Sequence, residues 1–289
     1  MDSQYYEELL EFLEEIDSID KGNENTLIKE LETIYDDMYD DLIDVILAFY
    51  GKYGEDLTWN DAHKTVNGTE LKEVAKRKER LKKLKDSTDI KEVKSKVQIE
   101  LQLLKNRGLI TRDKLLVDRI NERMTITTVL VATKIYQLIK ETYIRESGGK
   151  NIDITVPHFG KNWVERLFDN KNKLLNSIKV EILKGIEQGR DIRKTIKIVQ
   201  KLGNMSKYEA SRLVRTENCI ARTEGALENY RTNELITHVV IIAVGDDRTC
   251  PDCRSYDGTY IPIEEARVGN NIPPFHPSCR CCIAPVSDK

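Results

Sequence analysis

The stretch Cys250-Pro-Asp-Cys253, followed after an intervening span by His276-Pro-Ser-Cys279-Arg-Cys281-Cys282, decides how the C-terminal part of this chain folds. A Cys-x2-Cys pair and a His-x2-Cys pair each bring two donors close together, and the two pairs offer the four ligands of tetrahedral zinc. Five of the six cysteines lie in this stretch, and Cys219 stands apart. We therefore predict a structural zinc site here.

The spacing favours three cysteines as ligands and leaves the fourth position open between a histidine and a cysteine. The candidate ligands are Cys250, Cys253 and Cys279, with either His276 or Cys281 completing the set. Cys282 is a poorer candidate because adjacent residues seldom both reach one metal.

Two other interpretations of the cysteines are disulfides and free thiols. Disulfides need an oxidising compartment, whereas the opening residues, Met1-Asp-Ser-Gln-Tyr-Tyr-Glu-Glu, lack the features of a signal peptide. The expectation is therefore a reducing cytoplasm, or a particle assembled there. Free thiols without a cofactor remain the second alternative.

Catalytic zinc fits the pattern less well than structural zinc. A zinc deaminase carries His-x-Glu ahead of Pro-Cys-x-x-Cys, but here Thr249 precedes Cys250, and His238 is followed by two valines. We expect the metal to stabilise a loop-rich segment that is too small for a hydrophobic core of its own.

The charges are distributed unevenly along the 289 residues. Residues 1–50 carry sixteen acidic side chains and two lysines, a net of −14, so the rest of the chain carries +11 to give the total of −3. Lysine and arginine are dense over residues 70–95. This pattern suits a protein that docks onto charged partners or works near nucleic acid, and solvated helix faces are the plain alternative. No apolar run approaches the roughly 18 residues that cross a bilayer, so no membrane role is expected.

Apolar residues at helical spacing predict a mainly α chain. Two acidic helices come first, one with Tyr6, Leu9, Leu13 and Ile16 in its stripe, and a polar link over 20–25 is expected to join them as a hairpin. Further helices are predicted over 71–85, 93–107, 113–143, 163–186 and 192–202. Gly203-Asn204 is expected to end the last of these, and a capping box at 206–209 to open the next, toward Asn233.

The helix after residue 206 repeats one tripeptide seven residues apart, as Arg215-Thr216-Glu217 and Arg222-Thr223-Glu224. Seven residues are about two helical turns, so both copies share a face. A salt-bridge network is the favoured interpretation. An active site is the alternative, because Arg and Glu together can clamp a phosphate.

The last part of the chain changes to β patterns. Residues 237–244 form a β-branched run that predicts a buried strand, and Ser255–Tyr260 predicts a tight hairpin with Asp257-Gly258 at its turn. We therefore predict an elongated helical N-terminal region over 1–147 and a helical module over 150–289. The module would end in a small β-hairpin zinc knuckle at 246–286.

Residues 157–286 resemble the phage head morphogenesis family, also called minor head or Mu F-like proteins. The resemblance rests on five motifs: Phe159-Gly-Lys-Asn-Trp163, Gly189-Arg-Asp-Ile192, Ala221-Arg-Thr-Glu224, Asp247-Arg-Thr-Cys250-Pro-Asp-Cys253 with Tyr256-Asp-Gly258, and Pro273-Pro-Phe-His276-Pro-Ser-Cys279-Arg-Cys281. The sequence departs from the family pattern at Cys282, directly after the Cys-Arg-Cys ending.

The resemblance implies a few-copy, non-enzymatic component of the virion, assembled in the host bacterial cytoplasm. Portal protein and other head proteins are the partners it implies, with packaged DNA as a further one. Two other functions stay open: a nucleic-acid-binding module that uses the basic body, and a zinc-dependent nuclease or hydrolase with Asp246, Asp247 and His276 near the metal.

Overall fold

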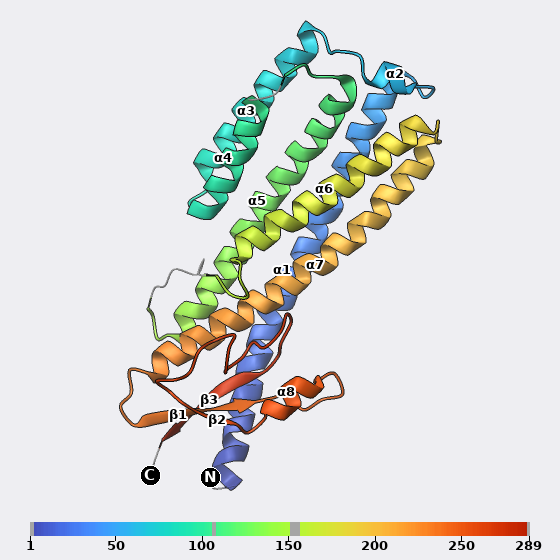
Figure 1. Cartoon of the computed structure of the whole chain (residues 1–289). Helices are drawn as coiled ribbons and strands as arrows, with labels where there is room; N and C mark the ends of the chain where they lie inside the picture. The colour runs from blue at the N-terminus through green and yellow to red at the C-terminus, as the bar shows by residue number, and fades with distance from the viewer. Residues whose placement is uncertain (1–2, 106–107, 151–156, 288–289) are drawn as a thin grey trace. The chain divides into compact units, whose positions relative to one another are not determined.

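The computed structural model describes residues 3–105, 108–150 and 157–287, with side chains described from residue 22 onward. A mainly α fold with a small antiparallel sheet near the C-terminus is confirmed (Figure 1). The helices are α1 Ser3–Tyr53, α2 Trp59–Ala62, α3 Gly68–Ser87, α4 Lys91–Lys105, α5 Arg112–Glu146, α6 Trp163–Glu187, α7 Ile192–Tyr230 and α8 Pro251–Tyr256. The strands are β1 Ile236–Ile242, β2 Tyr260–Pro262 and β3 Cys282–Ser287. Among the described helices, none is both long and apolar enough to span a membrane.

Helix α1 is continuous, so the prediction of two helices joined over residues 20–25 is wrong. The link contains Gly22 but no proline, and one glycine costs a helix only about 1 kcal/mol relative to alanine. Thr26 Oγ1 donates to the Gly22 carbonyl at 2.7 Å, so its hydroxyl is satisfied within the helix. Apolar residues at helical spacing in the second part of α1 are buried, namely Leu27, Leu31, Met38, Leu42 and Phe49. The side chains of Tyr6, Leu9, Leu13 and Ile16 lie outside the described part.

The described residues form two compact units, each assembled from segments that are distant in sequence. The first unit comprises 1–29, 134–163 and 210–289, and the second comprises 30–133 and 164–209. A boundary between residues 147 and 150 remains a prediction from the sequence.

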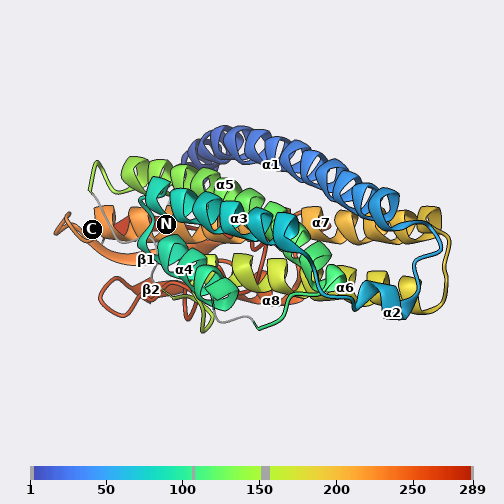
Figure 2. The same cartoon turned by 90° about the horizontal axis from the view of Figure 1, so that it is seen from above.

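The second unit buries charged side chains between its helices. Lys171 Nζ of α6 lies 2.6 Å from Glu100 Oε1 of α4 and 2.8 Å from Asn121 Oδ1 of α5. Burial lowers the pKa of Lys171, because the ammonium group loses its hydration. A buried charge without its partner is strongly destabilising, so this cluster fixes the three helices against one another. Helices α3 and α4 of the same unit lie side by side (Figure 2).

Helix α7 is also continuous, so the break predicted at Gly203-Asn204 and the capping box at 206–209 are wrong. Gly203 lies within the helix, and its lack of a Cβ lets the Tyr39 ring pack directly against it. A Cβ at this position would lie 2.7 Å from the ring. The carboxylate of Asp191 accepts from the Arg193 amide at 2.7 Å and caps the start of the helix.

Strand β1 is the centre of the sheet in the first unit, which has the order β2-β1-β3 with both pairings antiparallel. Val239 and Ile241 pack in one apolar cluster with Leu227 of α7, while Val240 and Ile242 pack in another. Both faces of β1 are therefore covered, which explains its unbroken apolar run. Ile242 pairs with Cys282. The end of β1, which leads to the first cysteine pair, therefore lies beside the start of β3, which follows the second pair.

Candidate metal centre

Helix α8 positions the first pair of cysteines. Cys250 is its N-cap and accepts a hydrogen bond from the Cys253 amide at 3.4 Å, and Pro251 follows at the first helical position. Gly258 has φ +71° just beyond Asp257, which is a common way to end a helix. The hairpin predicted over Ser255–Tyr260 is therefore wrong: the Asp-Gly pair ends a helix, and β2 follows it to pair with β1.

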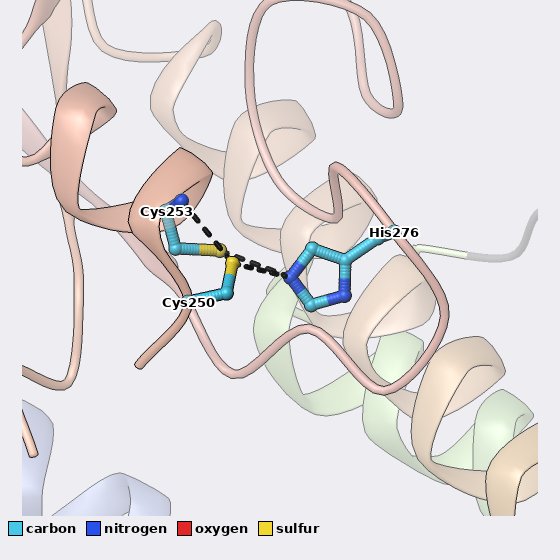
Figure 3. Close-up of side chains that lie close together, drawn as sticks. All are labelled: Cys250, Cys253 and His276. Carbon is cyan, nitrogen blue, oxygen red and sulfur yellow. Dashed lines mark hydrogen bonds between the residues drawn. The ribbon is translucent and has the colours of Figure 1, made fainter. Parts of the chain in front are cut away.

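The ring of His276 faces the first pair of cysteines (Figure 3). Its Nδ1 lies 2.9 Å from the Pro277 carbonyl oxygen, a contact that requires Nδ1 to carry the proton and donate it. The lone pair of Nε2 is then directed to the sulfurs, which lie 3.3 Å away at Cys250 and 3.1 Å away at Cys253. A carbonyl on the far nitrogen is how proteins orient a metal-ligating histidine.

The separation between two of the sulfurs fits a tetrahedral zinc ion. With Zn–S bonds of about 2.3 Å, tetrahedral geometry places two sulfurs about 3.8 Å apart. The sulfurs of Cys253 and Cys279 are 3.7 Å apart. The ligand atoms form two groups of three, and within each group all three atoms lie within 4.8 Å of one another. One group is Cys250, Cys253 and His276, and the other is Cys253, Cys279 and Cys281. Thiolate and imidazole donors in this arrangement suit zinc, and Cys253 joins the two groups.

The remaining cysteines differ in where they point. Cys281 is buried within the cluster as a fifth donor, next to Cys253 and Cys279. The sulfur of Cys282 faces the Ile242 carbonyl at 3.9 Å and packs in the sheet, in agreement with its low rank as a ligand. Cys219 is buried on α7, and burial raises the pKa of its thiol to about 12.

We call the pair of Cys250 and Cys253 the first clamp and the pair of His276 and Cys279 the second clamp. Each clamp contains one thiol whose pKa is lowered. The hydrogen bond from the Cys253 amide lowers the pKa of Cys250. The neighbouring Cys281 thiol lowers the pKa of Cys279 to about 5, whereas burial raises the pKa of Cys253 to about 12. Because metals bind the thiolate, the lowered pKa values of Cys250 and Cys279 favour the form of these side chains that binds a metal.

Asp246 connects the two clamps through Arg280, which stands between two of the candidate ligands. The guanidinium donates to both carboxylate oxygens, at 2.7 and 2.5 Å, and holds the pKa of Asp246 well below its usual range. The same carboxylate accepts from the Arg248 amide and the Thr249 hydroxyl, at 3.0 and 3.1 Å. Asp246 therefore pairs with an arginine instead of facing the sulfurs, and neither group of three donors contains a carboxylate.

The repeated tripeptide of α7 contacts the second clamp. Thr216 Oγ1 accepts from the Ser278 amide at 2.9 Å, and Ser278 has φ +59°. Arg222 donates to the Cys281 carbonyl at 3.5 Å. Arg215 pairs with Glu24 of α1 at 3.4 Å, which is one ion pair of the salt-bridge network predicted for the repeat. The contacts of Thr216 and Arg222 with the clamp were missed, because nothing local in the sequence links α7 to residues 278–281.

Residues 176–284 match the family model described as Phage Mu protein F like protein. This region of the chain resembles the Mu F-like family. The Mu F-like region begins within α6 and ends within β3, so it includes all five candidate ligands and the repeated tripeptide. It confirms the family resemblance over most of the range in which the sequence motifs placed it. Neither the curated proteins nor the solved structures gave a significant match.

Proposed function

We propose that this protein is a minor capsid protein of a tailed phage or prophage, acting in head morphogenesis without enzymatic activity. The match of residues 176–284 to the Mu F-like family carries this proposal. The matched region contains both cysteine clamps and the helix that holds the second of them. The protein would be a virion component that assembles in the host bacterial cytoplasm.

Portal protein and other head proteins are the proposed partners, with packaged DNA as a further one. The opposite charges of residues 1–50 and of the rest of the chain support docking onto charged surfaces. In this proposal residues 1–147 reach toward the partners, and residues 150–289 form the head-morphogenesis-like module.

Structural zinc is the proposed cofactor of that module. Cys250, Cys253, Cys279 and His276 would hold it, with Cys281 as the competing donor. The zinc would act as a crosslink between α8 and the segment before β3. The separation of the sulfurs and the orientation of the imidazole support this assignment.

Particle composition tests the proposed function. A tagged full-length chain would be produced in a host during growth of its phage or induction of its prophage, and heads would be purified on a density gradient. We expect the chain to sediment with heads and to be retained by immobilised portal protein. Wild type and Cys282→Ser should behave alike, since this sulfur faces the sheet, whereas Cys250→Ser should be depleted. Exclusion of the wild-type chain from heads at every stage of assembly would contradict the proposal.

A further inference from the structure

The basic residues of α3 divide into two sets, one paired within the second unit and one exposed. Arg77 is buried, and its guanidinium group lies 3.4 Å from the carboxylate of Asp118. Arg80 donates to both carboxylate oxygens of Glu122, at 2.5 and 2.9 Å. Both arginines of the helix are therefore paired with carboxylates of α5, and lysines supply the charge on its exposed side.

Four exposed lysines of α3 form what we call the lysine face, namely Lys72, Lys76, Lys82 and Lys83. None of the four makes a hydrogen bond or an ion pair with any part of the chain that the structure describes. Lys72, Lys76 and Lys83 stand at i, i+4 and i+11, which 3.6 residues per turn place on one side of a helix. At 1.5 Å per residue, these three extend over about 16 Å.

Positive charge exceeds negative charge on the lysine face. The exposed carboxylates of α3 are Glu79 and Asp86, and Asp86 pairs with Lys85 at 3.6 Å. Four unpaired lysines therefore stand against the one unpaired carboxylate of Glu79. In this unit the side chains outside the described part belong to residues 105–107, Lys-Asn-Arg, which add no negative charge. The neighbouring α4 carries more unpaired lysines than unpaired carboxylates, with Lys91, Lys94 and Lys96 against Glu92.

The carboxylates of α1 that reach α3 do so away from the lysine face. Asp41 and Asp44 line a cavity together with Glu73 and Arg80 of α3, and none of the four lysines belongs to its lining. Glu73 and Arg80 also pair with each other, at 3.1 Å. These contacts therefore leave the charge of the lysine face unbalanced.

The composition of the lysine face suits the phosphate backbone of a nucleic acid duplex. Lysine carries a compact charge on a flexible stem and is depleted from the cores of protein–protein interfaces. Within α3, which is described throughout, there is no aromatic residue for base stacking, and the one large apolar side chain that is exposed is Leu71. Duplex DNA carries a negative charge about every 1.7 Å, or about ten over the length of the lysine face.

We propose that the lysine face binds the phosphate backbone of double-stranded DNA without regard to base sequence. This assignment rests on the proposed function, since it gives the DNA partner named there a binding surface. Helix α3 lies outside residues 176–284, so the surface is separate from the region that matches the family. Glu79 is the carboxylate that opposes binding.

Fluorescence anisotropy of a labelled DNA duplex, titrated with the full-length chain at several salt concentrations, tests the proposal. The triple variant Lys72→Gln, Lys76→Gln, Lys83→Gln should bind more weakly than wild type. The slope of log affinity against log salt should become shallower by about 2.7, because each lost phosphate contact removes about 0.9. Glu79→Gln should tighten binding, since it removes a charge that repels phosphate. Duplexes of unrelated sequence should give equal affinities.

The matched control is the triple variant Lys173→Gln, Lys179→Gln, Lys184→Gln, which removes three exposed, unpaired lysines from α6 of the same unit. It should change the slope by less than about one contact, and circular dichroism checks that both triple variants are folded. The proposal is wrong if wild type does not bind the duplex, or if the α3 variant keeps the affinity and slope of wild type. Equal losses in the two triple variants would also contradict it, since binding would then follow net charge.

Labelled polyglutamate and purified heads separate this proposal from its alternatives. Tighter binding of polyglutamate than of DNA at the same salt would contradict the proposal, because the lysine face would then fit an acidic protein. The α3 variant should still sediment with heads, since residues 176–284 are unchanged. A wild-type chain that sediments with heads but binds no DNA contradicts this proposal alone. A chain that binds DNA through the lysine face but is excluded from heads contradicts the proposed function alone.

Discussion

Five donor atoms form two groups of three that share Cys253 at the candidate metal centre. A tetrahedral ion takes four ligands, so His276 and Cys281 compete for one position. The imidazole of His276 is fixed by the Pro277 carbonyl, which leaves Nε2 facing the sulfurs of Cys250 and Cys253. Cys281 also has a structural role, because its carbonyl accepts from Arg222 and from the Cys219 thiol. The backbone of Cys281 can perform that role whichever side chain it carries.

We therefore predict that His276 is the fourth ligand and that Cys281 is dispensable for zinc. His276→Ala should lower zinc affinity by more than the roughly 10- to 100-fold that follows loss of a group that merely orients a ligand. Cys281→Ser should retain one zinc per chain. Competition with a chromophoric chelator measures both affinities.

Cys282→Ser provides the control for the loss of one thiol in this segment, since its sulfur faces the Ile242 carbonyl and packs in the sheet. It should bind zinc as wild type does. Zinc lost from Cys281→Ser but kept by His276→Ala would reverse the assignment of the fourth ligand.

At the scale of helices, two breaks that the sequence predicted at glycines are absent, because α1 continues through Gly22 and α7 continues through Gly203. Gly22 lies within α1, where a Cβ would meet nothing within 4 Å. Gly203 lies within α7, where the Tyr39 ring leaves no room for a Cβ. Helical periodicity correctly predicted the helices on either side of each glycine. A local pattern does not show whether a glycine ends a helix or makes room for a neighbouring side chain.

These two glycines predict opposite effects of the same substitution on the free energy of unfolding. Gly22→Ala should stabilise the protein by up to about 1 kcal/mol, because alanine is the better helix former and the site is open. Gly203→Ala should destabilise it by about 1–3 kcal/mol, because the new methyl group displaces a buried ring. Urea denaturation followed by circular dichroism measures both. Equal effects of the two substitutions would show that Tyr39 does not pack closely on α7.

At the scale of the whole molecule, the sequence predicted the elements better than their assembly. The spacing of Cys250, Cys253, His276 and Cys279 predicts a common metal site, because a separation of two residues holds the donors of each pair close together. The pairing of Asp246 with Arg280 could not be predicted, since it joins segments that are far apart in the sequence. Each compact unit combines such segments, and hydrophobic periodicity says which face of a helix is buried but not what buries it.

The two units give the final prediction, which concerns zinc removal. The candidate metal centre lies wholly within the first unit, where Phe275 packs against both the cysteine cluster and the apolar cluster around β1. The second unit has its own interior of buried leucine and isoleucine and the ion pair between Lys171 and Glu100. Because binding of a structural zinc contributes directly to folding, chelation should remove amide-exchange protection from β1, α8 and β3.

Amides of α3 and α4 should stay protected under the same conditions, because their packing through Leu81, Leu101 and Leu104 needs no metal. Hydrogen exchange read by mass spectrometry, with and without a zinc chelator, resolves the two sets of peptides. Restored protection on adding zinc back would show that the loss is reversible and specific. If protection fell equally in both units, the metal would stabilise the chain as one cooperative body; if it fell in neither, zinc would not be a structural element of this fold.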